Sequence, residues 1–345
     1  MQRRELIDWL TCPDPEPLLA EADRVRREVH GDGVHLRAIV ELSSHCRRDC
    51  LYCGLRRGNT GPTRFRLSPE EALAATRAAA EAFGTVVLQA GEDPALGEEQ
   101  VGRLIQDLRA GSDAALTLSL GDQPRAALAA WRAAGADRYL LKFETASHAL
   151  HACLRAGCTL PERLATLETL RELGYQLGSG NMVGLPGQRV EDLADDLLLM
   201  QRLELDMAGI GPFLPHPATP LAGPQAPRLL DLTLRCLALA RLLLPRAHLP
   251  ATTALGTLVE GGRELGLAAG ANVLMQDATP VEYKRLYEIY PDRICRDEPI
   301  ARCRVCLPAR LRALGRFPAD GRGDALPRSS DGAPRSESRP EEGPP

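Results

Sequence analysis

The 345-residue sequence lacks the long apolar runs and the charge excess that mark several classes of protein. No apolar stretch approaches the ~20 residues that cross a bilayer, so we expect no membrane partner. The formal net charge is −4, which gives no electrostatic reason to expect a nucleic acid as a partner. The opening residues contain no apolar core of a secretory signal, and we therefore expect a cytoplasmic location.

Cysteine is plentiful, with ten copies, whereas only two of the 42 basic residues are lysine. Hydrophobic residues make up 44% and charged residues 26%, the composition of an ordinary globular protein. In a reducing cytosol disulfides are rare, and clustered cysteines more often hold metal. The division of the ten cysteines along the chain is therefore the most informative feature.

The composition changes near residue 319. From about Ala319 to Pro345 the residues are small, polar or charged, or are prolines, and Leu326 is the one large apolar residue of the segment. Such a segment buries too little surface to offset its ordering entropy, so we predict a disordered tail over residues 319–345.

Before that tail, short β-rich runs alternate with helical patterns. The expected strands are His35–Leu42, Thr85–Gln89, Ala115–Leu120, Arg138–Phe143, Gln176–Val183, Asp206–Ile210, Leu249–Thr253 and Ala271–Met275. The clearest helices between and after them are Pro69–Phe83, Glu98–Ala110, Pro124–Ala134, Pro161–Leu173, Val190–Leu203, Arg228–Leu244 and Arg263–Leu267. Ser68 followed by Pro69 and two glutamates is a typical helix start.

Eight β-then-α units predict a parallel TIM-type (β/α)8 barrel over residues 34–285. A doubly wound open sheet is the alternative, although no G-x-G-x-x-G follows the first strand. Residues 1–33 hold two helices that we expect to cover one end of the barrel, and residues 286–318 form a C-terminal cysteine-bearing extension. In such a barrel the chemistry belongs at the carboxyl ends of the strands.

A cysteine motif follows the first strand. Cys46, Cys50 and Cys53 stand in a C-x₃-C-x₂-C loop, with Tyr52 just before the third cysteine. Thiolates are the usual ligands of iron–sulfur clusters, and three ligands on a four-iron cluster leave one iron open to a substrate or cofactor. A structural zinc site is disfavoured because zinc cysteines normally come as two matched pairs.

This motif resembles the signature of the radical S-adenosylmethionine (SAM) superfamily. The resemblance implies a 4Fe–4S cluster whose open iron chelates SAM, and reductive cleavage of SAM to a 5′-deoxyadenosyl radical.

Longer stretches narrow the resemblance. They are Glu41–Arg56, Gly180–Gln188, Gly209–Leu221, Pro250–Gly262 and Leu286–Cys295, and they resemble the FeFe-hydrogenase maturase family HydE. The resemblance implies a role in assembly of the hydrogenase H-cluster, on a small cysteine-bound iron carbonyl cyanide complex. It also implies sister hydrogenase maturases as partners and a reductant such as ferredoxin or flavodoxin.

A second cysteine group, Cys295, Cys303 and Cys306, resembles the accessory cluster site of many members of that family, of 2Fe–2S or 4Fe–4S type. An empty surface site without a catalytic role is an equal alternative. Cys12, Cys153, Cys158 and Cys236 match no ligand pattern, and we expect them to pack as small hydrophobic residues.

The family resemblance also assigns a cofactor site and a substrate site. The residues it implies for SAM are Tyr52, Gln89, Gly91, Glu92, Thr117, Glu144, Arg163 and Met207. Arg163 resembles the arginine that pairs with the methionine carboxylate, a contact that suits a guanidinium fork. The residues implied for a small anionic substrate are Arg37, Ser119, Lys142, Thr252, Thr253, Met275 and Tyr287. We expect all of them at the carboxyl ends of the strands, although barrel packing is an alternative for the threonines and for Met275.

Two other functions stay open at this point. One is a radical SAM mutase of the methylornithine synthase type, acting on an amino acid. The other is a non-catalytic iron–sulfur or zinc-binding protein.

Overall fold

The computed structural model describes residues 1–327, except for the side chains of residues 303 and 304. Its strands are β1 Gly33–Ser43, β2 Thr85–Ala90, β3 Ala115–Ser119, β4 Arg138–Leu140, β5 Gln176–Val183, β6 Met207–Pro212, β7 Pro250–Ala251, β8 Val273–Asp277 and β9 Phe317–Pro318. Its helices are α1 Arg3–Thr11, α2 Glu16–His30, α3 Pro69–Phe83, α4 Glu98–Arg109, α5 Arg125–Ala134, α6 His148–Leu154, α7 Leu160–Glu172, α8 Val190–Arg202, α9 Leu229–Leu243, α10 Thr253–Leu258, α11 Gly262–Ala268, α12 Val281–Lys284 and α13 Ile300–Ala313.

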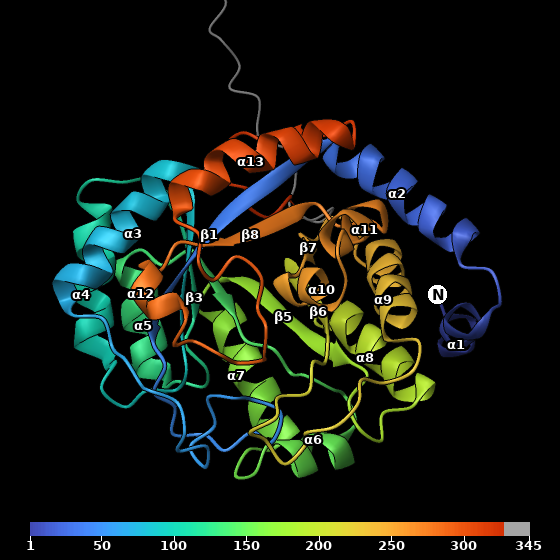
Figure 1. Cartoon of the computed structure of the whole chain (residues 1–345), viewed down its shortest axis with the longest axis horizontal. Helices are drawn as coiled ribbons and strands as arrows, with labels where there is room; N and C mark the ends of the chain where they lie inside the picture. The colour runs from blue at the N-terminus through green and yellow to red at the C-terminus, as the bar shows by residue number, and fades with distance from the viewer. Residues whose placement is uncertain (328–345) are drawn as a thin grey trace, which may run out of the picture.

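The eight predicted strands form a nearly closed parallel barrel. Their order in the sheet is β6-β5-β4-β3-β2-β1-β8-β7, and each printed pairing between them is parallel. A bridge between Met207 at the start of β6 and His248 just before β7 joins the two ends of this path. The structure therefore confirms the barrel prediction, and Figure 1 shows helices surrounding the strands.

Local sequence signals explain where α3 begins and ends. The Ser68 hydroxyl accepts a hydrogen bond from the Glu71 amide at 3.2 Å, and the Glu71 carboxylate accepts one from the Ser68 amide at 2.8 Å. This reciprocal capping box satisfies amides that have no partner inside the helix. At the other end Gly84 has a left-handed φ of 64°, which glycine adopts without a Cβ penalty.

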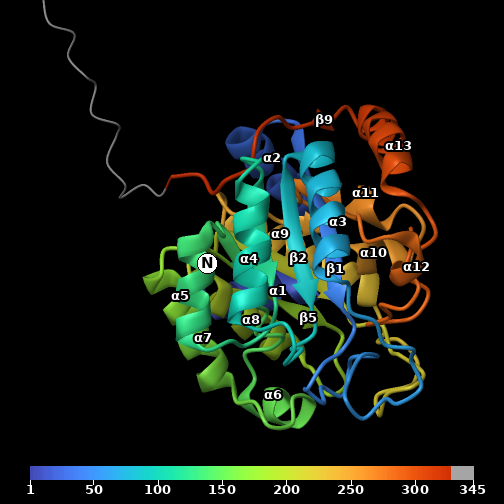
Figure 2. The ribbon, with the colours of Figure 1, turned by 90° about the vertical axis from the view of Figure 1, so that its left-hand side faces the viewer.

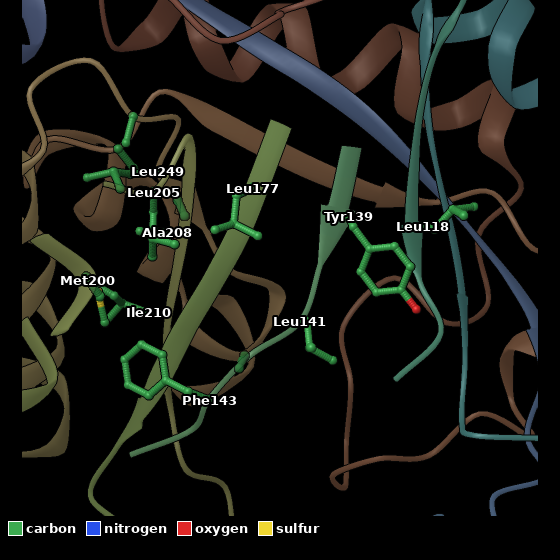
Figure 3. Close-up of a cluster of buried hydrophobic side chains, with 14 of the residues drawn as sticks. Leu118, Tyr139, Leu141, Phe143, Leu177, Met200, Leu205, Ala208, Ile210 and Leu249 are labelled. Carbon is green, nitrogen blue, oxygen red and sulfur yellow. The ribbon is translucent and has the colours of Figure 1, made fainter. Parts of the chain in front are cut away.

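The hydrophobic core lies between the strands and their covering helices. Figure 3 shows its side chains converging from β3, β4, β5, β6 and α8, and it labels Leu118, Tyr139, Leu141, Phe143, Leu177, Met200, Leu205, Ala208, Ile210 and Leu249. Complete burial of one such large apolar side chain contributes about 1.5–3 kcal/mol. Helix α5 adds Trp131, whose indole nitrogen donates to the carbonyl of Glu98 at 2.9 Å.

We expected the two N-terminal helices to cover one end of the barrel, and only the end of α2 reaches it. His30 there lies 3.0 Å from the Pro245 carbonyl oxygen in the loop before β7. Helix α1 packs on α8 and α9, and α2 packs on α9 and α11, outside the helical layer (Figure 1). Their apolar faces are narrow, with Leu6 and Leu10 buried on α1 and Leu18 and Ala22 on α2. A narrow apolar face suits packing against another helix.

The prediction of a disordered tail is wrong for residues 319–327, and residues 328–345 lie outside the described part of the chain. The Ala319 amide donates to the Val34 carbonyl at 2.9 Å, and Asp324 lies 2.8 Å from the guanidinium of the buried Arg138. In Figure 2 this red segment crosses the amino-terminal end of the barrel, opposite the blue loop that carries the cysteine motif. Ion pairs and main-chain bonds order the segment in place of apolar burial.

Within residues 1–327, no helix combines the length and apolarity that a bilayer crossing requires.

Candidate active site

The cysteine loop leaves the carboxyl end of β1 and is held by its own polar contacts. The Arg64 guanidinium donates to the carbonyls of Ser44, Leu55, Arg56 and Asn59 at 2.6–3.1 Å. Because one planar guanidinium group binds four carbonyls, it fixes the path of a loop that has little regular structure. The cysteines are therefore presented at the carboxyl end of the barrel, as predicted.

All three motif cysteines border one cavity of about 400 Å³. Burial raises the pKa of the Cys46 and Cys50 thiols, and it raises the pKa of Cys53 to about 12. Metal ligation needs the thiolate, so loading a cluster here would release protons. In residues 1–327 no three His, Cys, Asp or Glu side chains are grouped to hold a single metal ion. The cluster assignment therefore depends on the motif, the shared cavity and the family.

The same cavity brings together most of the residues that the family resemblance implied. Besides the three cysteines, its lining includes Tyr52, Gln89, Gly91, Glu92, Ser119, Lys142, Glu144, Arg163, Thr252, Thr253 and Tyr287. These residues come from the ends of six of the eight barrel strands or from the loops and helices that follow those strands. The cavity volume is in the range of small-molecule sites.

Two predicted residues sit in different elements from those we expected. Strand β7 ends at Ala251, so Thr252 is the N-cap of α10 and Thr253 is its first residue. The Thr252 hydroxyl accepts from the Leu255 amide at 3.3 Å, the usual role of a capping threonine. Both threonines still line the cavity, because the helix begins at its wall.

Four predicted residues do not line this cavity: Arg37, Thr117, Met207 and Met275. Arg37 lies toward the amino end of β1, opposite Met275 of β8 in the strand register, and it donates to the Met207 sulfur at 2.9 Å. It also donates to the Gly323 carbonyl of the C-terminal segment. The expectation that all site residues lie at the carboxyl ends is therefore wrong for these four, because side chains from the lower strand layers point into the barrel interior.

Glu144 occupies a strained backbone position at the cavity wall. Its φ is 68°, a left-handed value that a glutamate adopts only at a cost. The neighbouring loop is held by the buried carboxylate of Asp196, which accepts from the Ala146 amide at 2.5 Å and from Asn181 at 2.8 Å. Burial raises the pKa of Asp196 to about 7. Strain of this kind persists only where the surroundings enforce it, and it clusters at functional sites.

Acidic and basic groups alternate along the wall below the cysteine loop. Glu92 is nearly buried, and its carboxylate lies 3.2 Å from Arg47 and 2.5 Å from Arg48. Arg163 lies 3.1 Å from Asp122, while its buried Nε has no hydrogen-bond partner in the described part of the chain. That nitrogen is a donor that a carboxylate ligand can use.

The sequence reasoning missed several residues at the cavity. Arg155, at the end of α6, lines it and donates to the Tyr52 hydroxyl at 2.6 Å. Glu41, Tyr290 and Arg293 also line it, and Arg293 forms ion pairs with Glu41 and with Asp277 at 2.7 Å. The motif Glu41–Arg56 included Glu41, but no local pattern connects it to an arginine 252 positions away.

The second cysteine group is only partly described. Cys295 lies in the loop before α13 with a left-handed φ of 62°, and its sulfur accepts from Arg263 at 3.5 Å. Cys303 and Cys306 lie on α13, and nothing is described of the Cys303 side chain. The accessory cluster therefore stays a prediction. Of the four cysteines without a pattern, Cys158 and Cys236 are buried and Cys12 is half-buried. The expectation that all four pack in the interior is wrong for Cys153, which is exposed on α6.

The fold and the site point to one class of enzyme. Residues 40–200 match the model of the Radical SAM superfamily. A crystal structure of methylornithine synthase superposes with a TM-score of 0.79 at 25% identity, covering 92% of this chain and 94% of that one. The protein is a radical SAM enzyme built on a nearly closed parallel barrel.

Sequence relatives narrow the class. The chain is 48% identical over 305 residues to the [FeFe] hydrogenase maturase subunit HydE of Thermotoga maritima, covering 88% of this chain and 87% of that one. It is 30% identical over 274 residues to 3-methylornithine synthase of Methanosarcina acetivorans, covering 79% and 77%. The chain belongs to the HydE family.

Proposed function

We propose that this enzyme acts in assembly of the H-cluster of an [FeFe] hydrogenase. Its substrate is a small cysteine-bound iron carbonyl cyanide complex, and it works in the cytoplasm with sister maturases and a reductant such as ferredoxin or flavodoxin. The observation that carries the proposal is the 48% identity to a HydE maturase along nearly the whole barrel.

The residues present suit a SAM-binding 4Fe–4S cluster. Three thiols border one cavity, and two buried arginine nitrogens at its wall, Nε of Arg155 and Nε of Arg163, have no partner within residues 1–327. Unpartnered buried donors are costly, so their presence supports an anionic ligand at this wall. With both groups bound, the cluster would supply the one electron needed for reductive cleavage of SAM to methionine and a 5′-deoxyadenosyl radical.

The chain's own residues would hold and orient the SAM molecule. Arg163 would offer Nε to the methionine carboxylate, and Glu144 would accept hydrogen bonds from the amino group or the ribose hydroxyls. Gly91 and Met182 also line the wall, and the flexible Met182 side chain would pack against an apolar part of the ligand.

The substrate would occupy the remainder of the cavity. Lys142, Thr252 and Thr253 would supply a cation and two hydroxyls, and Tyr287 would contribute an aromatic wall. The Tyr287 hydroxyl accepts from Gln89 at 3.3 Å, which fixes its orientation. One cation with several hydroxyls suits a small anion.

The test begins with anaerobic reconstitution using iron and sulfide. We expect an electron paramagnetic resonance signal of the reduced cluster that changes on addition of SAM, and formation of 5′-deoxyadenosine. Cys50→Ala should abolish both, whereas Cys153→Ala, at an exposed cysteine, should change neither. Undiminished SAM cleavage by Cys50→Ala would refute the cluster assignment.

The substrate is tested separately. The iron carbonyl cyanide complex should be consumed together with SAM, whereas lysine should yield no methylornithine. Methylornithine formation would support the mutase alternative, which the relatedness to methylornithine synthase makes the main rival. Zinc as the sole bound metal, without any 5′-deoxyadenosine, would support a non-catalytic metal-binding protein.

A further inference from the structure

The cysteine loop packs against the end of helix α6. The residues of α6 that it contacts lie outside the cysteine motif. The Leu51 amide donates to the Leu154 carbonyl at 2.9 Å, and Arg48 donates to the Gly157 carbonyl at 3.3 Å. A small apolar cluster of Leu154, Leu185 and Phe213 packs with the Tyr52 ring beside this junction. The loop and the end of α6 therefore form one unit.

Arg155 is the charged group at this junction. Its side chain is 7% exposed, and it borders the same cavity as the three cysteines. Its Nη1 donates to the Tyr52 hydroxyl oxygen at 2.6 Å, while its buried Nε has no hydrogen-bond partner among the described residues. The Tyr52 hydroxyl also lies close enough to the Cys50 thiol to lower its pKa, although burial is the larger effect and raises that pKa overall. The contacts run from Arg155 through Tyr52 to a sulfur of the motif.

The positive charge of Arg155 is only partly neutralised by the protein, because the Glu144 carboxylate favours it from beyond ion-pair distance. Within residues 1–327, the nearest recorded carboxylate oxygen is Oδ2 of Asp122, at 4.0 Å, and that carboxylate pairs more closely with Arg163 at 3.1 Å. A buried guanidinium without a close carboxylate is expensive unless something anionic stands beside it. A cluster bound by three thiolates carries the required negative charge.

We propose that Arg155 is a positioning residue that tunes the cluster. It compensates cluster charge and orients the Tyr52 hydroxyl toward the sulfur of Cys50, so that it raises the reduction potential of the 4Fe–4S cluster. Net charge and hydrogen bonds to the sulfurs are two of the factors that set such potentials. A higher potential makes it easier for the external reductant to supply the electron that SAM cleavage consumes.

This inference rests on the proposed cluster at Cys46, Cys50 and Cys53. The experiment is a redox titration of the reconstituted full-length protein without SAM, followed by electron paramagnetic resonance. Arg155→Gln should shift the midpoint potential to a more negative value, and Arg155→Lys, which keeps the charge, should stay close to the unmodified protein. Tyr52→Phe should shift it in the same direction as Arg155→Gln, by a smaller amount.

The matched control is Arg138→Gln, which removes another buried arginine at the amino-terminal end of the barrel. It should leave the potential unchanged. A midpoint potential does not depend on how much cluster is loaded, so Arg155→Gln remains informative even with low iron content. If that variant holds no cluster at all, Tyr52→Phe provides the measurement.

The outcomes separate this inference from the proposed function. No SAM-responsive cluster in the unmodified protein would refute the proposed function. A normal cluster whose potential is the same in the unmodified protein, Arg155→Gln and Tyr52→Phe would refute the role of Arg155 alone. Equal shifts in Arg155→Gln and Arg155→Lys would refute charge compensation.

Discussion

Gly91 lies so close to Cys46 that a Cβ on the glycine would stand 2.7 Å from the Cβ of the cysteine and 2.5 Å from the His45 carbonyl oxygen. The loop after β2 and the cysteine loop after β1 therefore pack backbone to backbone. The absence of a side chain at position 91 is what permits this contact.

Gly91→Ala should displace the cysteine loop, because both clashing groups, the His45 carbonyl and the Cys46 Cβ, belong to that loop. We expect a destabilisation of about 1–3 kcal/mol, as for overpacking of a tight site, and fewer iron atoms bound per chain after reconstitution. Gly111→Ala is the control, since a Cβ there meets no atom within 4 Å. Full iron content in Gly91→Ala would show that the loop adapts without loss.

The strained backbone of Glu144 gives a second prediction, made with two variants that both remove the carboxylate. Both Glu144→Ala and Glu144→Gly should lower the affinity for SAM at least about tenfold, a loss of ~1.4 kcal/mol. Glu144→Gly should nevertheless be about 1 kcal/mol more stable than Glu144→Ala, because glycine adopts a φ of 68° without strain. Calorimetric SAM titration and thermal unfolding measure the two effects. Equal stabilities would argue against strain at this position.

The buried ion pairs of Arg293 predict a pH-dependent loss of stability. Burial and the neighbouring Asp277 raise the pKa of Glu41 to about 8, although Arg293 opposes the shift. Because this pKa lies above the value of about 4.3 in an unfolded chain, the contribution of Glu41 to stability falls as pH rises from about 4 to 8. Arg293→Met leaves two carboxylates facing each other, and it should cost about 3 kcal/mol at pH 9.

The cost of Arg293→Met should be smaller at pH 6, where Glu41 takes up a proton. Urea unfolding at both pH values measures the difference. Arg296→Met removes a neighbouring arginine whose side chain is 43% exposed, and it should change stability little at either pH. An equal cost of Arg293→Met at both pH values would contradict the protonation of Glu41.

The C-terminal segment gives a prediction of opposite pH dependence. Burial opposes the shift, but hydrogen bonds from Gln176 and Arg138 lower the pKa of Asp324 to about 2. A carboxylate with a lowered pKa stabilises the fold above about pH 4, and this stabilisation is lost as pH falls toward 2. Asp324→Asn should cost about 1 kcal/mol at pH 7, because the carboxylate is partly exposed, and less at pH 3.

Asp320→Asn, at an exposed residue of the same segment, is the control and should have little effect at either pH. Urea unfolding again provides the measurement. A pH-independent cost of Asp324→Asn would show that the segment is held by its main-chain contacts rather than by the ion pair.

The sequence by itself determined the barrel and the cysteine loop. Alternating β-rich and helical patterns are local, and so are capping signals such as Ser68 and Gly84, which is why the strand bounds agree within a few residues with the structure. The spacing of Cys46, Cys50 and Cys53 is equally local. A motif of this kind specifies its chemistry wherever the loop is placed, and it needs no knowledge of distant residues.

Only the tertiary structure decided which distant charges share the site. Arg155 reaches Tyr52 from 103 positions away, Arg293 reaches Glu41 from 252, and Asp324 reaches Arg138 from 186. The tertiary structure also decided which residues of a strand reach the cavity. Arg37 and Met275 were correctly predicted to lie in strands, but they lie toward the amino-terminal end of the barrel and do not line the cavity. A polar side chain has no periodicity that reveals its partner, because long-range pairing depends on burial and on the closure of the barrel rather than on the neighbouring sequence.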